Sequence, residues 1–139
     1  MQTFLPYPSF IESAKCLDNK RLGKQRVEAY QILRTLLGHS KGWINHPAVK
    51  MWKGYERSLA DYGLTVCDEW IQRGFKDTLR GKFNHYLDQD EYPEPEWLGD
   101  KQLHASHRSN LLRKDPKHYG QFGWTESDNL PYYWPTKEN

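Results

Sequence analysis

One carboxylate on a basic helical stripe is the first feature of the sequence that could do chemistry. Arg21, Lys24 and Glu28 follow one another at steps of three and four residues in a stretch without proline. These spacings place side chains on the same face of a helix. A carboxylate in that setting could act as a general base or as the counter-charge to a developing cation. The same pattern also fits a surface ion pair, which contributes only about 0.3 to 0.5 kcal/mol.

A pair of histidines in the segment HASHRSNLLRKDPKHYG (104–120) could bind a metal ion. His104 and His107 are three residues apart, and on a helix this spacing can bring two imidazoles to one metal ion. No acidic residue falls at a spacing that completes a familiar ligand set, so we expect neither a metal ion nor another cofactor. His107 could instead pack between Leu103 and Leu111 or point toward a phosphate.

The same segment is rich in the cations, hydroxyls and amides that contact nucleic-acid phosphates. The net charge is only +2, but Lys and Arg outnumber Asp and Glu by eight to three in residues 1–50 and by five to one in residues 101–121. We expect these two blocks to meet on one positive face, although a charged helix end can have the same composition. The expected contacts from the second block are His107, Arg108, Arg113, Lys114 and Lys117.

Capping residues and hydrophobic spacing predict the helices that position these groups. A capping-box pattern at Ser9 begins a short helix. Asp18 can cap a second helix that runs from Asn19 to Leu37, and Gly38 is placed to end it. This second helix carries the stripe with the carboxylate.

A long third helix is predicted from Pro47 to Gly74, where large aromatic and aliphatic residues recur at helical spacing. Gly54 weakens this helix and could kink it. Asn45 could cap its start, where free backbone donors attract anions. Asn45 and His46 could equally face a phosphate backbone.

The remaining chain is predicted to contain two more helices and an aromatic tail. A short helix is expected at 77–87, and the acidic, proline-containing segment at 89–100 is typical of a surface loop. Asp100 caps a last helix that must end close to Pro116. The aromatic residues that follow should pack back across the domain, because exposing that many rings would be costly.

Together these elements predict an all-α fold, a compact single-domain helical bundle over residues 1–139 with a long central helix and an irregular, aromatic-rich C-terminal segment. Cys16 and Cys67 are expected to be reduced thiols in the core. No apolar run approaches the length of a membrane span and no signal segment is recognisable, so we expect no membrane partner and a cytoplasmic location. A monomer is the default expectation.

In their order along the chain, these motifs resemble the pyrimidine-dimer DNA glycosylases of the phage endonuclease V type. The resemblance is carried by the extended segment after Met1, by LDNKRLGKQRVEAYQIL (17–33), by GWINHPAVKMW (42–52), by QRGF (72–75) and, more loosely, by the basic helix and aromatics near the C-terminus. It implies a helical DNA glycosylase with associated AP-lyase activity. Its partner would be double-stranded DNA containing a damaged or modified base, with the pyrimidine dimer as default.

The resemblance places the family's nucleophile on the α-amine of Met1 and its acid–base glutamate on Glu28. An α-amine has a pKa of about 7.7 to 8.0, against about 10.4 for a lysine, so it is more often the neutral nucleophile at pH 7. Attack on the sugar displaces the base and leaves an imine, and removal of the C2′ proton then breaks the bond to the 3′ phosphate. We also expect Arg21, Lys24 and Arg26 to contact the DNA.

Three positions depart from the family pattern. Gln2, Val27 and Gln31 stand where the pyrimidine-dimer enzyme has arginines. Those arginines hold phosphates and displaced bases, which an apolar Val27 cannot do, and Arg26 lies about 100° around the helix from it. The pocket could therefore accept another lesion or a modified base.

Other functions remain compatible with the sequence. One is a non-catalytic DNA-binding module on the same fold. Another is a metal-dependent nuclease that uses His46, His104 and His107. A third is a partner-binding scaffold built on the aromatic tail.

Overall fold

The computed structural model describes residues 1–87 and 91–136, and within these ranges the chain forms helices and no strand. The predicted all-α class is therefore confirmed. The helices are α1 (Phe10–Cys16), α2 (Asn19–Leu36), α3 (Pro47–Lys50), α4 (Glu56–Gln72), α5 (Arg80–Asn84), α6 (Lys101–Lys114) and α7 (Pro116–Tyr119), followed by the 3-10 helix η1 (Gly120–Phe122).

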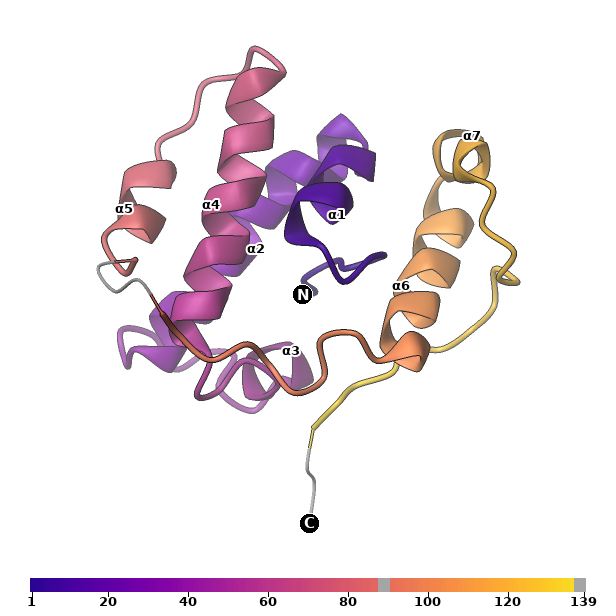
Figure 1. Ribbon diagram of the computed structural model, residues 1–139. Helices are drawn as coiled ribbons and strands as arrows, with labels where there is room; N and C mark the ends of the chain where they lie inside the picture. The colour runs from indigo at the N-terminus through magenta and orange to yellow at the C-terminus, as the bar shows by residue number, and fades with distance from the viewer. Residues whose placement is uncertain (88–90, 137–139) are drawn as a thin grey trace.

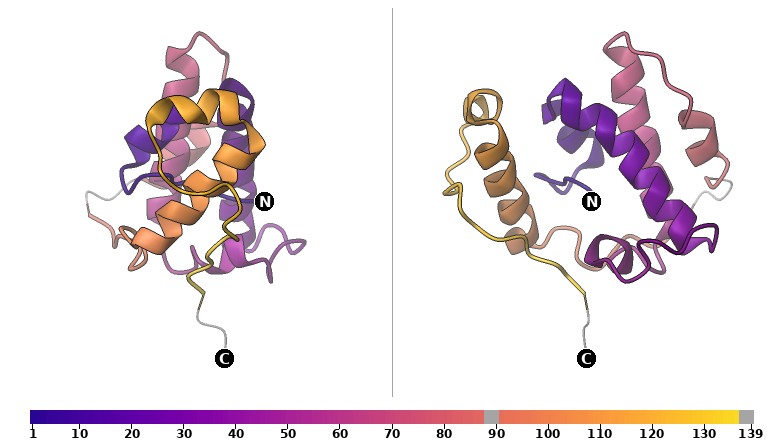
Figure 2. Two further views of the ribbon diagram at one scale, coloured as in Figure 1. Left: turned by 90° about the vertical axis from the view of Figure 1, so that its right-hand side faces the viewer. Right: turned by 180° about the vertical axis from the view of Figure 1, so that it is seen from behind.

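The N-terminal segment lies between two groups of helices (Figure 1). On one side α2 packs mainly against α4, which also contacts α1 and α5. On the other side stand α6 and α7, and the view from behind shows the same division (Figure 2). The core is filled by fully buried residues of these helices, among them Leu22 and Leu33 of α2, Leu59 and Val66 of α4 and Leu103 of α6.

The predicted helix starts are confirmed where a side chain caps the helix. The Ser9 hydroxyl accepts a hydrogen bond from a backbone N–H of α1, the Asp18 carboxylate does the same for α2, and the Asp100 carboxylate for α6. Gly38 follows α2 with a φ of 83°, a left-handed conformation that glycine adopts without steric cost. Local sequence therefore determines where α1, α2 and α6 begin.

The prediction of one long helix from Pro47 to Gly74 is wrong. The chain forms the short α3, turns at Gly54 with a φ of 88°, and begins α4 only at Glu56. The cap of α3 is also not Asn45, because the ring of His46 accepts a hydrogen bond of 3.0 Å from the backbone N–H of Ala48. The turn at Gly54 therefore separates the two helices.

The C-terminal half follows the expectations with shorter elements. The helix expected at 77–87 is present as the shorter α5, while residues 89 and 90 of the loop expected at 89–100 lie outside the described residues. The aromatic tail packs back across the molecule, since Trp124 stacks on Tyr119 at 5.7 Å between ring centroids and meets Tyr7 at 6.0 Å. In the described ranges, no helix is both long and apolar enough to cross a bilayer.

Both cysteines are free and buried, as expected. Burial raises the pKa of the Cys16 thiol to about 12 and also raises that of Cys67. Neither thiol is therefore a ready nucleophile at neutral pH.

Gly63 in α4 provides space for a ring of α5. A Cβ atom built on Gly63 would lie 2.3 Å from the ring of Phe83, which is fully buried. The cost of a glycine within a helix is thus offset by the close approach of α5 to α4.

We predict that Gly63→Ala lowers the free energy of unfolding by about 1 to 3 kcal/mol, the usual cost of overpacking a core. Urea unfolding would measure this loss. The control is Gly81→Ala in α5, where a Cβ meets nothing within 4 Å and a gain of up to about 1 kcal/mol is expected. A Gly63→Ala protein as stable as the wild type would show that Phe83 moves aside without cost.

Candidate active site

The N-terminal segment is buried from Gln2 to Pro6 and has no neighbouring strand to satisfy its backbone. Gln25 of α2 supplies two of the missing partners. Its side-chain oxygen accepts from the backbone N–H of Phe4 at 2.9 Å, and its side-chain nitrogen donates to the carbonyl of Gln2 at 2.8 Å. Tyr62 of α4 donates to the carbonyl of Phe4 at 3.0 Å. The segment is thereby fixed against α2 and α4.

His104 and His107 hold the same segment from the side of α6. The backbone N–H of Leu5 donates to Nδ1 of His107 at 2.8 Å, and the Leu5 carbonyl lies 2.7 Å from Nδ1 of His104. Nε2 of His104 accepts from the backbone N–H of Gly99 at 3.0 Å, so the proton of His104 is on Nδ1 and is donated to Leu5. The two imidazoles therefore bind both backbone groups of one residue.

This arrangement bears on the metal-binding role considered for the histidine pair and on the phosphate contact considered for His107. Three of the four ring nitrogens are engaged with backbone groups, and the fourth, Nε2 of His107, is buried without a partner. No group of three or more metal-ligating side chains occurs in the parts of the chain that the structure describes. His107 is fully buried, so its ring does not reach a DNA phosphate.

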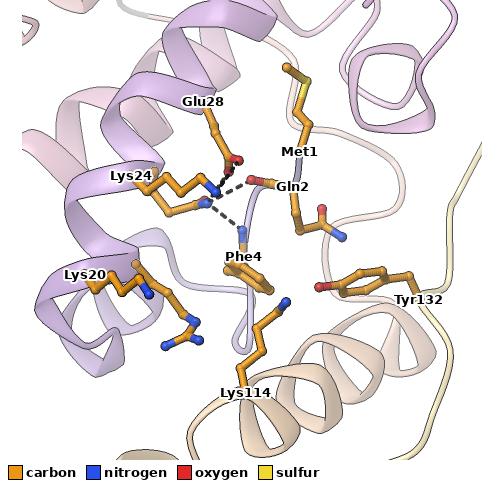
Figure 3. A pocket seen from close by; sticks show the side chains of 10 residues that line it. Met1, Gln2, Phe4, Lys20, Lys24, Glu28, Lys114 and Tyr132 are labelled. Atoms are coloured by element: carbon orange, nitrogen blue, oxygen red, sulfur yellow. Dashed lines mark hydrogen bonds and ion pairs between the residues drawn. The ribbon is translucent and has the colours of Figure 1, made fainter.

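Met1 and Glu28 line one cavity of about 330 Å³. Figure 3 shows Lys24 and Glu28 of α2 on one side of the N-terminal segment, with Tyr132 and Lys114 on the other. Both basic blocks of the sequence contribute to its wall, the first through α2 and the second through α6. The complete lining is Met1, Gln2, Phe4, Lys20, Arg21, Lys24, Gln25, Glu28, Lys114 and Tyr132.

The carboxylate of Glu28 is oriented by Gln25. The side-chain nitrogen of Gln25 that donates to the Gln2 carbonyl also donates to Glu28 at 3.0 Å. Lys24 lies 4.0 Å from the other carboxylate oxygen, but its side chain is 72% exposed. This ion pair therefore contributes little to the stability of the fold. Gln25 therefore links the backbone next to Met1 with the carboxylate that faces it.

Gln2, which lines the cavity, carries a buried hydrogen-bond donor without a partner. Its side-chain oxygen accepts from the backbone N–H of Thr3 at 2.9 Å, which fixes the orientation of the amide. The side-chain nitrogen is buried and has no partner. Leaving a buried donor unsatisfied costs about 1 to 3 kcal/mol, so a movement of this side chain that brings the nitrogen to an acceptor would be favoured.

Other residues expected at a DNA interface are engaged within the protein. Arg26 pairs with Asp77 at 2.5 Å and lies over the ring of Trp70. Arg108 pairs with Glu126 at 2.8 Å and donates to the Pro6 carbonyl at 2.7 Å. These two arginines are bound to the fold and are absent from the cavity wall.

The remaining expected residues are not part of the cavity wall. Arg113 donates to the Asp128 carbonyl at 3.1 Å, and Lys117 is exposed on α7. Asn45 is exposed in the loop before α3. The pKa of His46 is lowered, chiefly by partial burial and further by the Met1 amine, while Glu28 opposes the shift. His46 therefore lies within electrostatic reach of both groups.

A comparison with protein families assigns the sequence to a known group. Residues 1–82 match the family model of pyrimidine dimer DNA glycosylases. The chain belongs to the pyrimidine dimer DNA glycosylase family. The protein is thus a DNA glycosylase, and DNA is its substrate. Comparisons with curated proteins and with solved structures give no match.

The matched residues of the glycosylase include Met1, Gln25 and Glu28, whereas Lys114 and Tyr132 lie beyond them. The sequence predicted Met1, Arg21, Lys24, Glu28 and Lys114 as site residues but missed others of the lining. Lys20 could have been found from its helical spacing to Lys24. Nothing local in the sequence indicates that Phe4 and Tyr132 approach α2.

Burial lowers the pKa of His107 to about 3, with smaller contributions from His104 and Arg108. Above the ordinary value of 6.5 the ring is neutral in both the folded and unfolded states. Below it the unfolded chain gains a proton that the folded chain does not, so His107 should remove about 1 kcal/mol of stability per pH unit as the pH falls from 6.5 toward 3.

We predict that His107→Asn reduces this loss, measured by urea unfolding at pH 7, 6 and 5. His104 and His46 also have lowered pKa values, so part of the slope of unfolding free energy against pH should remain. The control is His39→Asn at an exposed position, which should leave the slope unchanged. An equal slope in the wild type and in His107→Asn would contradict the assignment of a neutral, buried ring.

Proposed function

We propose that the glycosylase excises its base through the α-amine of Met1, with Glu28 as the acid–base group, and that it also cleaves the strand as an AP lyase. The observation that carries the proposal is the shared cavity of Met1 and Glu28, whose two sides are joined by the Gln25 amide. A nucleophile and a proton-transfer group held at one cavity are the parts that this chemistry requires.

The amine is the attacking group in this reaction. The lone pair of the Met1 nitrogen forms a bond to C1′ while the glycosidic bond breaks, and the departing base takes up a proton that the nitrogen gives up. Opening of the sugar ring breaks the bond from C1′ to the ring oxygen and leaves an imine between Met1 and C1′, and the ring oxygen takes up the second proton of the amine. Glu28 then removes the acidified C2′ proton, the new double bond forms, and the 3′ phosphate leaves. Water finally hydrolyses the imine.

The cations around the cavity suit the flanking phosphates of the DNA. Lys20, Arg21 and Lys24 approach from α2 and Lys114 from α6, so a strand whose nucleotide enters the cavity would meet positive charge on both sides. A single chain contributes every group named here, which supports a monomer as the working unit. The amine and the carboxylate supply the nucleophile and the proton transfer, so we propose a metal-independent reaction.

The residues that line the cavity favour a substrate base that carries a hydrogen-bond acceptor. Gln2 lines the cavity, and once its buried side-chain nitrogen turns toward the cavity it can donate to a carbonyl oxygen or ring nitrogen of the base. Val27 and Gln31 lie outside the cavity wall, and neither can replace an arginine at a phosphate. We therefore propose a damaged or modified base as the substrate, with the pyrimidine dimer as the first to be tested in a panel of duplexes.

We predict that Glu28→Gln lowers the rate of strand cleavage by about 10² to 10⁴, the usual contribution of a general acid–base group. The variant should keep the fold and DNA affinity, because a glutamine oxygen can still accept from Gln25. Single-turnover cleavage of a duplex with an abasic site measures the rate. Glu12→Gln, on the exposed side of α1, should cleave like the wild type. Unimpaired cleavage by Glu28→Gln would remove the assigned role.

A second prediction concerns the amine itself. A peptide tag left on the α-amine of Met1, or its acetylation, should abolish borohydride trapping on abasic DNA and strand cleavage, because an amide nitrogen is not a nucleophile. A C-terminal tag of the same length is the control and should be harmless. Trapping of the N-terminally blocked protein would exclude the Met1 amine. If the untagged protein binds DNA but is never trapped by borohydride, a non-catalytic DNA-binding module is favoured. If EDTA abolishes cleavage, a metal-dependent nuclease is favoured.

A further inference from the structure

A row of aromatic rings leads from the cavity to an exposed loop. Tyr132 lines the cavity beside Phe4, at 6.4 Å between ring centroids. Trp134 follows at 5.6 Å from Tyr132, His46 at 5.8 Å from Trp134, and Trp43 at 5.8 Å from His46. We call these four residues, Tyr132, Trp134, His46 and Trp43, the ring row. It joins the C-terminal segment to the loop between α2 and α3.

The outer end of the ring row is an exposed apolar tip. Trp43 is 49% exposed and the adjacent Ile44 is 55% exposed. The turn that presents them is closed by a hydrogen bond of 2.9 Å from the N–H of His46 to the carbonyl of Trp43. Figure 2, left, shows the segment between α2 and α3 projecting on the same side of the molecule as the N-terminus. The exposed apolar surface of these two side chains does not contribute to the packing of the fold.

The surroundings of the tip indicate a nucleic-acid partner. The preceding Lys41 is exposed, and the cavity at the other end of the ring row is walled by lysines and an arginine. Exposed rings between cations are the combination that binds bases and backbone together. When a nucleotide is turned out of a duplex, it leaves a gap between its neighbours, and apolar side chains can enter such a gap.

We propose that Trp43 and Ile44 form a wedge that enters the base stack of the DNA beside the nucleotide held in the cavity. The proposal rests on the proposed function, because the cavity must take a nucleotide from the duplex. Its partner is duplex DNA with a disrupted step, and the ring row sets the position of the wedge relative to Met1 and Glu28. Insertion would occupy the gap and keep the nucleotide from returning.

The test compares binding to two duplexes of the same sequence, one intact and one with a central tetrahydrofuran abasic analogue. Fluorescence anisotropy gives both dissociation constants, and 2-aminopurine next to the analogue reports stacking. Trp43→Ala should lower the preference for the analogue duplex about tenfold, within the range that one base–aromatic contact contributes. It should also lose the 2-aminopurine signal, while Trp43→Phe keeps most of both.

Matched controls separate the wedge from general hydrophobic contact. Ile44→Ala should reduce the preference, whereas Ile71→Ala and Ile11→Ala, which remove similarly exposed side chains from α4 and α1, should not. Thermal unfolding of each variant should match the wild type, because Trp43 and Ile44 are not part of the core.

Three results would overturn the wedge. The first is an unchanged preference in Trp43→Ala, and the second is an equal loss of affinity for both duplexes. The third is a wild-type dimer that Trp43→Ala converts to a monomer without an effect on DNA, which would make the tip an interface between copies. The analogue has no C1′ hydroxyl and cannot form an imine, so these outcomes do not depend on the amine chemistry. Failure of the proposed function appears separately, as absent borohydride trapping on natural abasic DNA.

Discussion

Side-chain hydrogen bonds to one buried, extended segment are the constraint on which the arrangement of this glycosylase depends. Gln25, Tyr62, His104 and His107 satisfy the backbone of Gln2, Phe4 and Leu5. A buried backbone group without a partner costs about 1 to 3 kcal/mol, so the loss of any one of these side chains would destabilise the fold. They come from α2, α4 and α6, and the segment therefore connects the two groups of helices.

The same network positions the residues of the candidate site. Glu28 is on a long helix, and Met1 is adjacent to a backbone carbonyl that Gln25 binds. A site held by regular elements and by a supporting layer of hydrogen bonds is more accurate than one on free loops. The flanking cations are different, since Lys24 is largely exposed. On the proposed mechanism, the reacting groups would be held in place while the cations that contact phosphates could adjust to the DNA.

Features that depend on neighbouring residues could be predicted from the sequence, and features that depend on distant ones could not. Asp18 and Asp100 are a few residues from the N–H groups that they cap, so α2 and α6 were predictable. The break before α4 depends on a left-handed turn at Gly54, which helical spacing does not reveal. The roles of His107 and Arg108 depend on Leu5 and Pro6, about a hundred positions away. A charged or polar helix face alone does not distinguish such anchors from DNA contacts.

The bonds from α6 to Leu5 have a consequence for synthesis of the chain on the ribosome. The first residues emerge long before His104 and His107 are translated, and they cannot take their final positions until α6 follows. Contacts so distant in sequence close late in folding because the intervening loop must be ordered first. A nascent or interrupted chain could therefore form α2 and α4 while its amine remains unanchored. On the proposed mechanism, reactivity toward DNA would arise only once the last helix has docked.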